Sequence, residues 1–116
     1  MKEKNSSIQV VAVEPESSPL ISKGYAGAHK IQGIGANFIP ENFDKSVCDQ
    51  VKTVSDEKAF ECARLLAKKE GILAGISTGA NLAVAIELAK LDENKGKIIV
   101  TIVTDMGDRY LSTALY

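Results

Sequence analysis

The sequence predicts an α/β fold, a three-layer αβα sandwich with a mostly parallel sheet. Short apolar runs rich in β-branched residues alternate along the chain with stretches of helical periodicity. The joints between them are short, which favours parallel βαβ units with right-handed crossovers. The chain has 116 residues, 45% of them hydrophobic and 25% charged, so it has the size and balance of one small globular domain. We expect residues 1–116 to form a single α/β unit.

The first elements are a strand and a short helix. IQVVAV (8–13) is a continuous apolar run typical of a strand covered on both faces, and Glu14-Pro15 should end it. Ser17 or Ser18 followed by Pro19 predicts the start of a short helix that ends near Gly24. A long glycine-containing segment, GYAGAHKIQGIGANFIP (24–40), then shows no clear period, and loops of this length are more often functional than not.

The second part of the chain repeats the alternation of strands and helices. QVKTV (50–54) predicts a strand, and Ser55 predicts the N-cap of a helix that Gly71 closes. ILAGI (72–76) predicts a further short strand, and the residues from about 79 to 91 a largely buried helix. KIIVTIVT (97–104) shows the strongest strand pattern of all. A parallel sheet of three or four strands is narrow, and its first strand would lie at an edge, so we expect this chain to be part of something larger.

Composition and charge exclude several classes of function. The formal net charge of −1 gives no basic surface for a nucleic acid. No apolar run is long enough to cross a membrane, and the N-terminus does not resemble a secretory signal, so we expect a cytoplasmic location. Cys48 and Cys62 stand apart from each other and from any histidine cluster, which indicates reduced thiols.

Ligands of open α/β sheets bind at the carboxyl ends of the strands, and three loops qualify here. One is GISTGAN (75–81), in which Ser77 could meet a heteroaromatic nitrogen with a neutral hydroxyl. The alternative is that Ser77 or Thr78 only caps the following helix. The second is GIGAN (33–37), whose glycines allow either close approach to a substrate or a turn with positive φ.

The third loop, TDMGDRY (104–110), carries Asp105 and Asp108, which could act as acids or metal ligands but more often cap turns. His29 is the only histidine, and without a nucleophile or a second ligand nearby it reads as a loop residue. No lysine stands in a context that marks a nucleophile, and we expect neither a catalytic residue nor a metal site in this chain.

Three long motifs in register resemble cysteine synthase (O-acetylserine sulfhydrylase), an enzyme family with the tryptophan-synthase-β type of fold. They are HKIQGIGANFIP (29–40), EGILAGISTGANLAVAIELAK (70–90) and GDRYLSTALY (107–116), and VAVEPESSPL (11–20) also matches. The resemblance covers essentially the whole chain and implies the C-terminal part of a domain that binds pyridoxal 5′-phosphate. Cystathionine β-synthase shares the fold and a similar serine turn, but the first and third motifs look more like cysteine synthase.

The resemblance implies a role for seven residues. Ser77 would face the pyridine nitrogen of the cofactor, and Thr78 and Gly79 would complete the turn beneath its ring. Gly33, Ile34, Gly35 and Ala36 would line the substrate cleft, which in the family also receives the C-terminal tail of serine acetyltransferase. The implied reaction converts O-acetylserine and sulfide to cysteine and acetate, in an enzyme that is a homodimer.

The resemblance also implies what the chain does not contain. The Schiff-base lysine, the loop that grips the substrate carboxylate and the loop that cradles the cofactor phosphate would all lie upstream, so we expect the isolated chain to be inactive. Position 104 is Thr where the family often has Pro. A non-catalytic module that binds an acetyltransferase tail, or a fragment that persists by self-association, remain alternatives.

Overall fold

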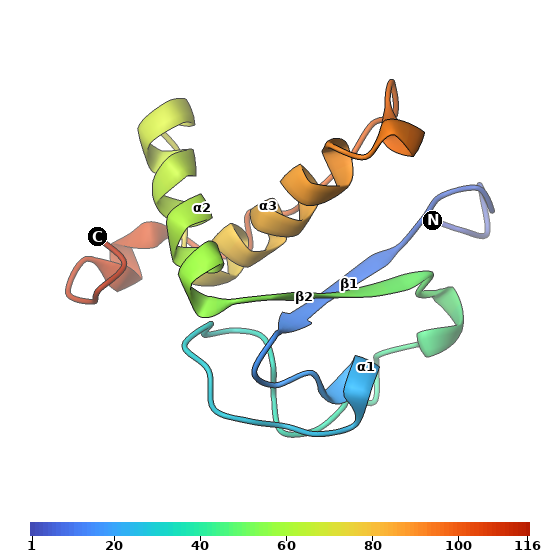
Figure 1. Ribbon diagram of the computed structural model, residues 1–116, viewed down its shortest axis with the longest axis horizontal. Helices are drawn as coiled ribbons and strands as arrows, with labels where there is room; N and C mark the ends of the chain where they lie inside the picture. Colours follow the sequence, from blue (N-terminus) through green and yellow to red (C-terminus); the bar gives the residue numbers. More distant parts are fainter.

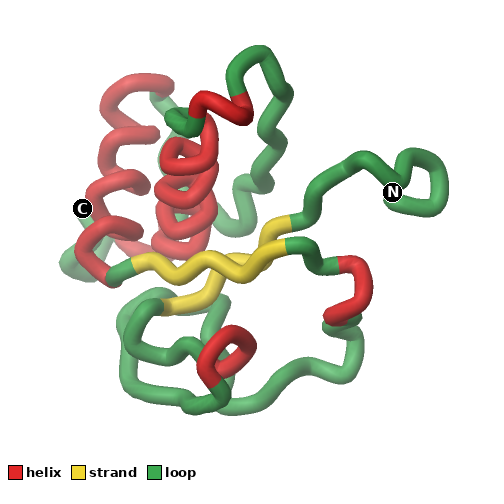
Figure 2. Tube along the Cα trace, turned by 45° about the vertical axis from the view of Figure 1, so that its right-hand side comes forward, coloured by secondary structure: helices red, strands yellow, loops and turns green.

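Two parallel strands lie at the centre of the structure, a computed structural model that describes residues 1–116. β1 (Val11–Pro15) pairs with β2 (Gln50–Val54) in a register that runs from Val11 opposite Gln50 to Pro15 opposite Val54. The helices α2 (Asp56–Glu70) and α3 (Ile76–Ala89) cover one face, and α1 (Leu20–Lys23) lies on the other with the long loop that follows it (Figures 1 and 2). The predicted α/β class with its parallel sheet is confirmed, in a reduced form with two strands.

β1 occupies a different range from the predicted strand at 8–13. It begins at Val11, where pairing with β2 begins, and it continues through Pro15 instead of ending before it. Proline lacks a ladder donor and is tolerated at a strand end. The ladder closes one residue later, where Glu16 N donates to Val54 O at 2.8 Å. The position of the partner strand, more than the apolar run, therefore set the bounds of β1.

The carboxylate of Glu14 caps α1 from outside the helix. Its two oxygens accept from Ile21 N at 2.8 Å and from Ser22 N at 2.9 Å, so two amides of this short helix are satisfied. The helix ends at Gly24 in the left-handed region (φ 81°), as predicted. The predicted serine cap is wrong, because Pro19 is the N-cap residue and Ser18 Oγ instead accepts from Gly27 N at 3.1 Å.

α2 forms as predicted because its start and stop signals are local. The Ser55 side chain accepts from Lys58 N at 3.2 Å, and Gly71 closes the helix at φ 70°. Its buried face consists of small residues, Ala59, Cys62 and Ala63, which allow α3 to approach closely. The hydrophobic core lies between these two helices and the sheet.

Two predicted strands are absent. Of the predicted strand 72–76, only Ala74 forms a bridge, antiparallel with Met106, and Ile76 already begins α3. Residues 97–104 run without any ladder, and Ile98 and Val100 are 91% and 84% exposed. A strand needs a neighbour to complete its hydrogen bonds, and the sheet contains only β1 and β2. Both sequence patterns are apolar and β-branched, but neither segment has a partner strand here.

The C-terminal residues return to α2 and complete the core (Figure 1). Leu115 is fully buried, and Arg64 of α2 holds this segment by donating from Nε to Leu115 O at 2.6 Å and from Nη2 to Ala114 O at 2.5 Å. Short 3₁₀ helices occur at Lys45–Val47, Asp92–Asn94 and Gly107–Tyr110. None of the helices combines the length and the apolar character that a membrane crossing requires.

Candidate cofactor-binding site

The GISTGAN segment forms the first turn of α3, not the loop before it. α3 begins at Ile76, three residues earlier than the predicted start, and its N-cap residue is Gly75, which has no side chain to offer. Ser77 and Thr78 therefore lie inside the helix, 3% and 2% exposed. The prediction that Ser77 or Thr78 caps the helix is wrong. Their hydroxyls are directed to residues that lie far away in the sequence.

Three hydroxyls gather around one carboxylate at this end of α3. Ser77 Oγ lies 2.6 Å from Thr104 Oγ1 and donates to Asp105 Oδ1 at 3.2 Å. Thr78 Oγ1 lies 3.2 Å from Thr104 Oγ1 and accepts from Thr104 N at 3.0 Å. The same Asp105 oxygen is 3.3 Å from Thr104 Oγ1 and 3.4 Å from Thr78 Oγ1. The result is a connected polar cluster, which we call the α3 hydroxyl cluster (Ser77, Thr78, Thr104 and Asp105).

Asp105 occupies the space that a side chain at position 75 would need. A Cβ built on Gly75 would lie 2.0 Å from Asp105 Oδ2, so glycine lets the carboxylate reach the N-terminus of α3. A negative charge is favourable there because the unpaired amides and the helix dipole are positive. Tyr110 donates its hydroxyl to the second Asp105 oxygen. That hydrogen bond, together with burial and the nearby negative charge, raises the pKa of Tyr110 to about 12.

The GIGAN loop is held over the hydroxyl cluster by two anchors. Ile31 is fully buried in the core, and His29 bridges the loop by accepting from Ile31 N at 3.1 Å through Nδ1 while Nε2 lies 2.9 Å from Gly35 O. The acceptor role of Nδ1 requires a neutral ring whose proton is on Nε2. Gly33, at φ 95°, then faces α3, and a Cβ built there would lie 3.6 Å from Ser77 Oγ.

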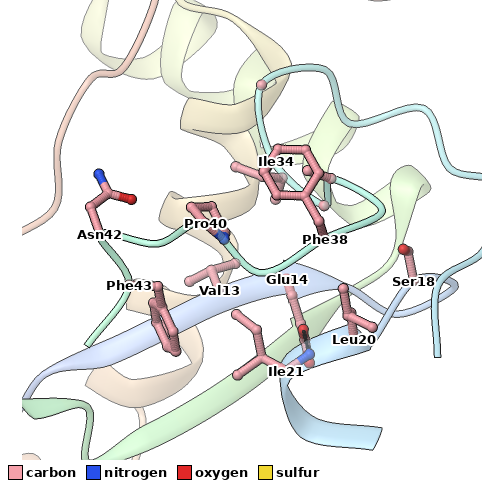
Figure 3. Close-up of a pocket in the computed structure, with 14 residues that line it drawn as sticks. Val13, Glu14, Ser18, Leu20, Ile21, Ile34, Phe38, Pro40, Asn42 and Phe43 are labelled. Atoms are coloured by element: carbon pink, nitrogen blue, oxygen red, sulfur yellow. Dashed lines mark hydrogen bonds between the residues drawn. The ribbon is translucent and has the colours of Figure 1, made fainter. Parts of the chain in front are cut away.

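The four predicted cleft residues line one hollow on the other side of this loop. It measures about 640 Å³, and Gly33, Ile34, Gly35 and Ala36 form part of its wall. Figure 3 shows Ile34 and Phe38 on the loop facing Val13, Glu14 and Ile21 of the β1–α1 segment. Ser77 does not line this hollow. Gly33 is the residue that belongs to both places, because it lines the hollow and lies beside the Ser77 hydroxyl.

Gly79 faces a different direction from Ser77. A Cβ at Gly79 would lie 2.0 Å from Ala59 O and 2.8 Å from Ala63 Cβ, so this glycine allows the close crossing of α3 over α2. Of the predicted cofactor residues, the structure brings Ser77 and Thr78 together in the hydroxyl cluster and places Gly79 against the neighbouring helix.

Sequence reasoning missed two members of the site. Thr104 entered only as a departure from the usual residue of a family, and Tyr110 was not considered. Asp105 was weighed as an acid, a metal ligand or a turn cap, and it proves to bond the hydroxyls at the start of α3. The chain brings together no group of three His, Cys, Asp or Glu side chains that could hold a metal ion. The one sequence signal for the missed residues was that the TDMGDRY segment follows a predicted strand, where α/β sheets bind their ligands.

The hydroxyl cluster is chemically suited to a heteroaromatic nitrogen. A serine hydroxyl can either donate one hydrogen bond or accept from a protonated nitrogen. The Gly33 backbone beside it adds no side chain that would exclude a flat ring. The donor set thus fits a heteroaromatic ring nitrogen such as that of pyridoxal phosphate.

Comparison with known proteins places the chain in a family. The profile described as "Pyridoxal-phosphate dependent enzyme" matches residues 1–105. The chain belongs to this family. Among curated members, the cysteine synthase of Staphylococcus aureus is 47% identical over all 116 residues, which are 37% of its length. The chain thus spans a little over a third of the relatives that it matches.

Solved structures of the family agree in fold. The crystal structure of cysteine synthase from Entamoeba histolytica superimposes with a TM-score of 0.96 at 43% identity, covering 99% of this chain and 34% of that one. A hydrogen sulfide-producing enzyme from Fusobacterium nucleatum gives a TM-score of 0.91 at 49% identity, covering 95% of this chain and 38% of that one. The resemblance to cysteine synthase inferred from the three motifs is confirmed.

Proposed function

We propose that this chain provides the part of a cysteine-synthase-type active site that contacts the ring nitrogen of pyridoxal phosphate. Ser77 is the contact residue, Thr78 follows it in the first turn of α3 beneath the ring, and Gly79 supports that turn by allowing α3 to pack closely on α2. The observation that carries the proposal is the buried Ser77 hydroxyl in the first turn of α3, with the Gly33 backbone beside it. Thr78 supports Ser77 through their common partner, Thr104 Oγ1.

The reaction that we propose for the complete active site is a β-replacement, in which O-acetylserine and sulfide give cysteine and acetate. Pyridoxal phosphate would supply the electron sink for this chemistry. The residues of this chain bind and orient: Ser77 fixes the ring nitrogen, and Gly33 and Gly35 present bare backbone to the substrate. His29 keeps that loop in place through Gly35 O and Ile31 N.

We further propose that the 116-residue chain is not catalytic by itself. The family resemblance places the lysine that binds the cofactor and the phosphate loop in sequence that this chain does not match, and the chain corresponds to 37% of the S. aureus relative. The complete protein would act as a cytoplasmic homodimer. The chain would then contribute one side of the active site, and the covalent chemistry would depend on residues that this chain does not supply.

Binding and activity can be measured separately on the purified chain. Pyridoxal phosphate is titrated against the chain and followed by absorption and fluorescence, and cysteine formation from O-acetylserine and sulfide is assayed in parallel. We expect weak binding without cysteine formation. The Ser77→Ala variant should bind about tenfold less tightly, because a hydrogen bond of about 1.4 kcal/mol is lost. Ser6→Ala, at an exposed residue, serves as the control.

Two results would contradict the proposal. Equal affinity of the wild-type chain and Ser77→Ala would remove Ser77 from the site. Cysteine formation, together with cofactor that borohydride fixes to a lysine of this chain, would show that the chain is catalytic alone.

A binding module without chemistry is the second candidate, and the hollow beside the GIGAN loop favours it. Its wall combines apolar side chains such as Ile34 and Phe38 with the polar Asn42, which suits a short peptide such as the tail of serine acetyltransferase. Titration with a C-terminal peptide ending in isoleucine tests this function. Binding that is lost in Ile34→Asp but kept in Ser77→Ala would favour the module over the enzyme.

A further inference from the structure

Residues 97–104 have the sequence of a buried strand but neither a partner strand nor a cover. Five apolar side chains on the two sides of this extended segment are between 37% and 91% exposed: Ile98, Ile99, Val100, Ile102 and Val103. None of the residues 98–103 forms a backbone–backbone hydrogen bond. Apolar side chains on both sides are typical of a strand inside a parallel sheet, where both faces are covered. The segment therefore presents unpaired backbone groups together with apolar side chains to the solvent.

Residues 72–74 form a second uncovered segment that runs toward the same end of α3. They lead into the N-terminus of α3, and residues 97–104 return from its C-terminal end to that N-terminus, where Thr104 N donates to Thr78 Oγ1 at 3.0 Å (Figures 1 and 2). Two segments that approach the start of one helix in this way occupy the strand positions of a βαβ unit. The isoleucine and the leucine of 72–74 are each 42% exposed, and the sheet contains only β1 and β2. The unit thus lacks the neighbouring strands that would complete it.

The longer relatives indicate what kind of partner this surface fits. The E. histolytica structure superimposes on 99% of this chain with a TM-score of 0.96, and the match uses only 34% of that chain. The polypeptide therefore follows the same path through residues 97–104 in a protein that carries about twice as much additional chain. The extended path of the segment is already the one adopted beside that additional polypeptide, so the surface is preformed for it.

We propose that the face formed by Ile98, Val100 and Ile102 docks a second polypeptide, one that carries the remaining two thirds of a cysteine-synthase-type protein and adds a parallel strand to residues 97–104. The inference rests on the proposed function, because it names the polypeptide that would supply the rest of the active site. Strand addition satisfies the free backbone groups of the segment. Burial of the apolar side chains supplies most of the affinity.

A second copy of this chain fits the surface less well than such a polypeptide. Edge-to-edge pairing of two copies would satisfy one edge of each 97–104 segment and leave its other edge unpaired. The helices α2 and α3 of each copy pack on each other and on its own sheet, so they are not free to cover the apolar side chains of the other copy. Self-association is therefore the behaviour that we expect of the chain when the fitting polypeptide is absent.

The test joins this chain to the part of the S. aureus cysteine synthase that it does not match. The two parts are co-produced as separate polypeptides and also as a single chain, in which this chain replaces the matched 37% and a protease site marks the junction. We expect an equimolar complex that survives cleavage, in which the amides of residues 98–103 exchange with solvent at least about tenfold more slowly than in the chain alone. This exchange is followed by mass spectrometry.

Two variants of this chain show whether the proposed face carries the docking. Ile98→Lys/Val100→Lys should weaken the complex about tenfold or more, because two apolar side chains of the interface become charged. Leu111→Lys, which changes an exposed apolar residue outside the segment, should bind as the wild type does. Circular dichroism of each variant alone confirms that its fold is retained.

The outcomes separate this inference from the proposed function. A complex that protects residues 98–103 but binds no pyridoxal phosphate supports the docking and overturns the proposed function. Separation of the two parts after cleavage overturns the docking, and so does exchange at 98–103 that is as fast in the complex as in the chain alone. A complex that is equally tight with the double lysine variant also overturns it. If the chain continues to associate with itself in the presence of the S. aureus part, the surface belongs to a second copy and the proposal is wrong.

Discussion

The carboxylate of Asp105 fills the place of the missing side chain of Gly75. These residues are 30 positions apart, and they are joined by a backbone hydrogen bond from Gly75 N to Asp105 O at 3.1 Å. The Asp105 carboxylate can reach the start of α3 only because position 75 has no Cβ, since an ideal Cβ would lie 2.0 Å from Oδ2. Gly75 is thus required because the Asp105 carboxylate, which accepts a hydrogen bond from Ser77, needs the space that a side chain at position 75 would take.

Gly75→Ala should therefore destabilise the chain. Its methyl group would displace Asp105 from Ser77 and Tyr110, and steric insertion into a packed site costs about 1–3 kcal/mol of unfolding free energy. Chemical denaturation of the wild type, Gly75→Ala, Asp105→Ala and the double variant measures the cost and its origin. The double variant should be more stable than the sum of the single effects predicts. If the effects of Gly75→Ala and Asp105→Ala were additive, the new methyl group would not clash with the Asp105 carboxylate.

Gly79→Ala should lower stability although alanine is the better helix former. On an exposed helix site this change stabilises by about 1 kcal/mol, but here the new methyl group would meet Ala59 O at 2.0 Å. Moving α3 away from α2 loses contacts along the whole crossing, so we expect a net loss of about 2 kcal/mol or more. Ala89→Ser, at an exposed position of the same helix, should change the unfolding free energy by less than about 0.5 kcal/mol. A Gly79→Ala variant as stable as the wild type would contradict the close crossing.

The parts of the fold that could be predicted from sequence are those whose signals are local. α2 was predicted with its cap Ser55 and its terminal Gly71, because both ends are determined by the residues next to them. The segment 97–104 has a stronger strand pattern than β2, and yet β2 is the strand. The difference is the partner: β2 pairs with β1 over five residues, and no strand lies beside 97–104.

The candidate site divides in the same way. Ser77 and Gly33 were identified from motifs, and the structure places the Gly33 backbone next to the Ser77 side chain. The Ser77–Thr104 contact spans 27 residues and depends on how the C-terminal segment returns to α3. No periodicity or spacing encodes that return. The start of α3 was placed too late because Ser77 and Thr78 have the side chains of a cap, whereas Asp105 supplies the negative charge from a distant loop.

The Tyr110–Asp105 hydrogen bond predicts a loss of stability at alkaline pH. The pKa of Tyr110 is raised from its ordinary value of 10.0 to about 12 in the folded chain. A raised pKa stabilises the protonated folded form fully below pH 10, and this contribution disappears as the pH rises toward 12. The difference in melting temperature between the wild type and Tyr110→Phe should therefore shrink between pH 10 and 12. A constant difference over this range would contradict the hydrogen bond, and tyrosinate absorption gives a direct check.

The exposed segment 98–103 should make the isolated chain associate with itself. Ile98, Val100 and Ile102 are 91%, 84% and 69% exposed in an extended segment without a ladder, and an unpaired apolar edge of this kind is a template for pairing with another chain. Sedimentation at several concentrations should show association that is weakened in the variant Ile98→Lys/Val100→Lys. Leu111→Lys, which also replaces one exposed apolar side chain outside the segment, is the control and should associate as the wild type does. The unfolding free energy of the double variant should change by less than about 0.5 kcal/mol per site, because neither side chain is buried. A wild-type chain that stays monomeric at every concentration would contradict this prediction, and the structural alternative of a self-associating fragment would then be excluded.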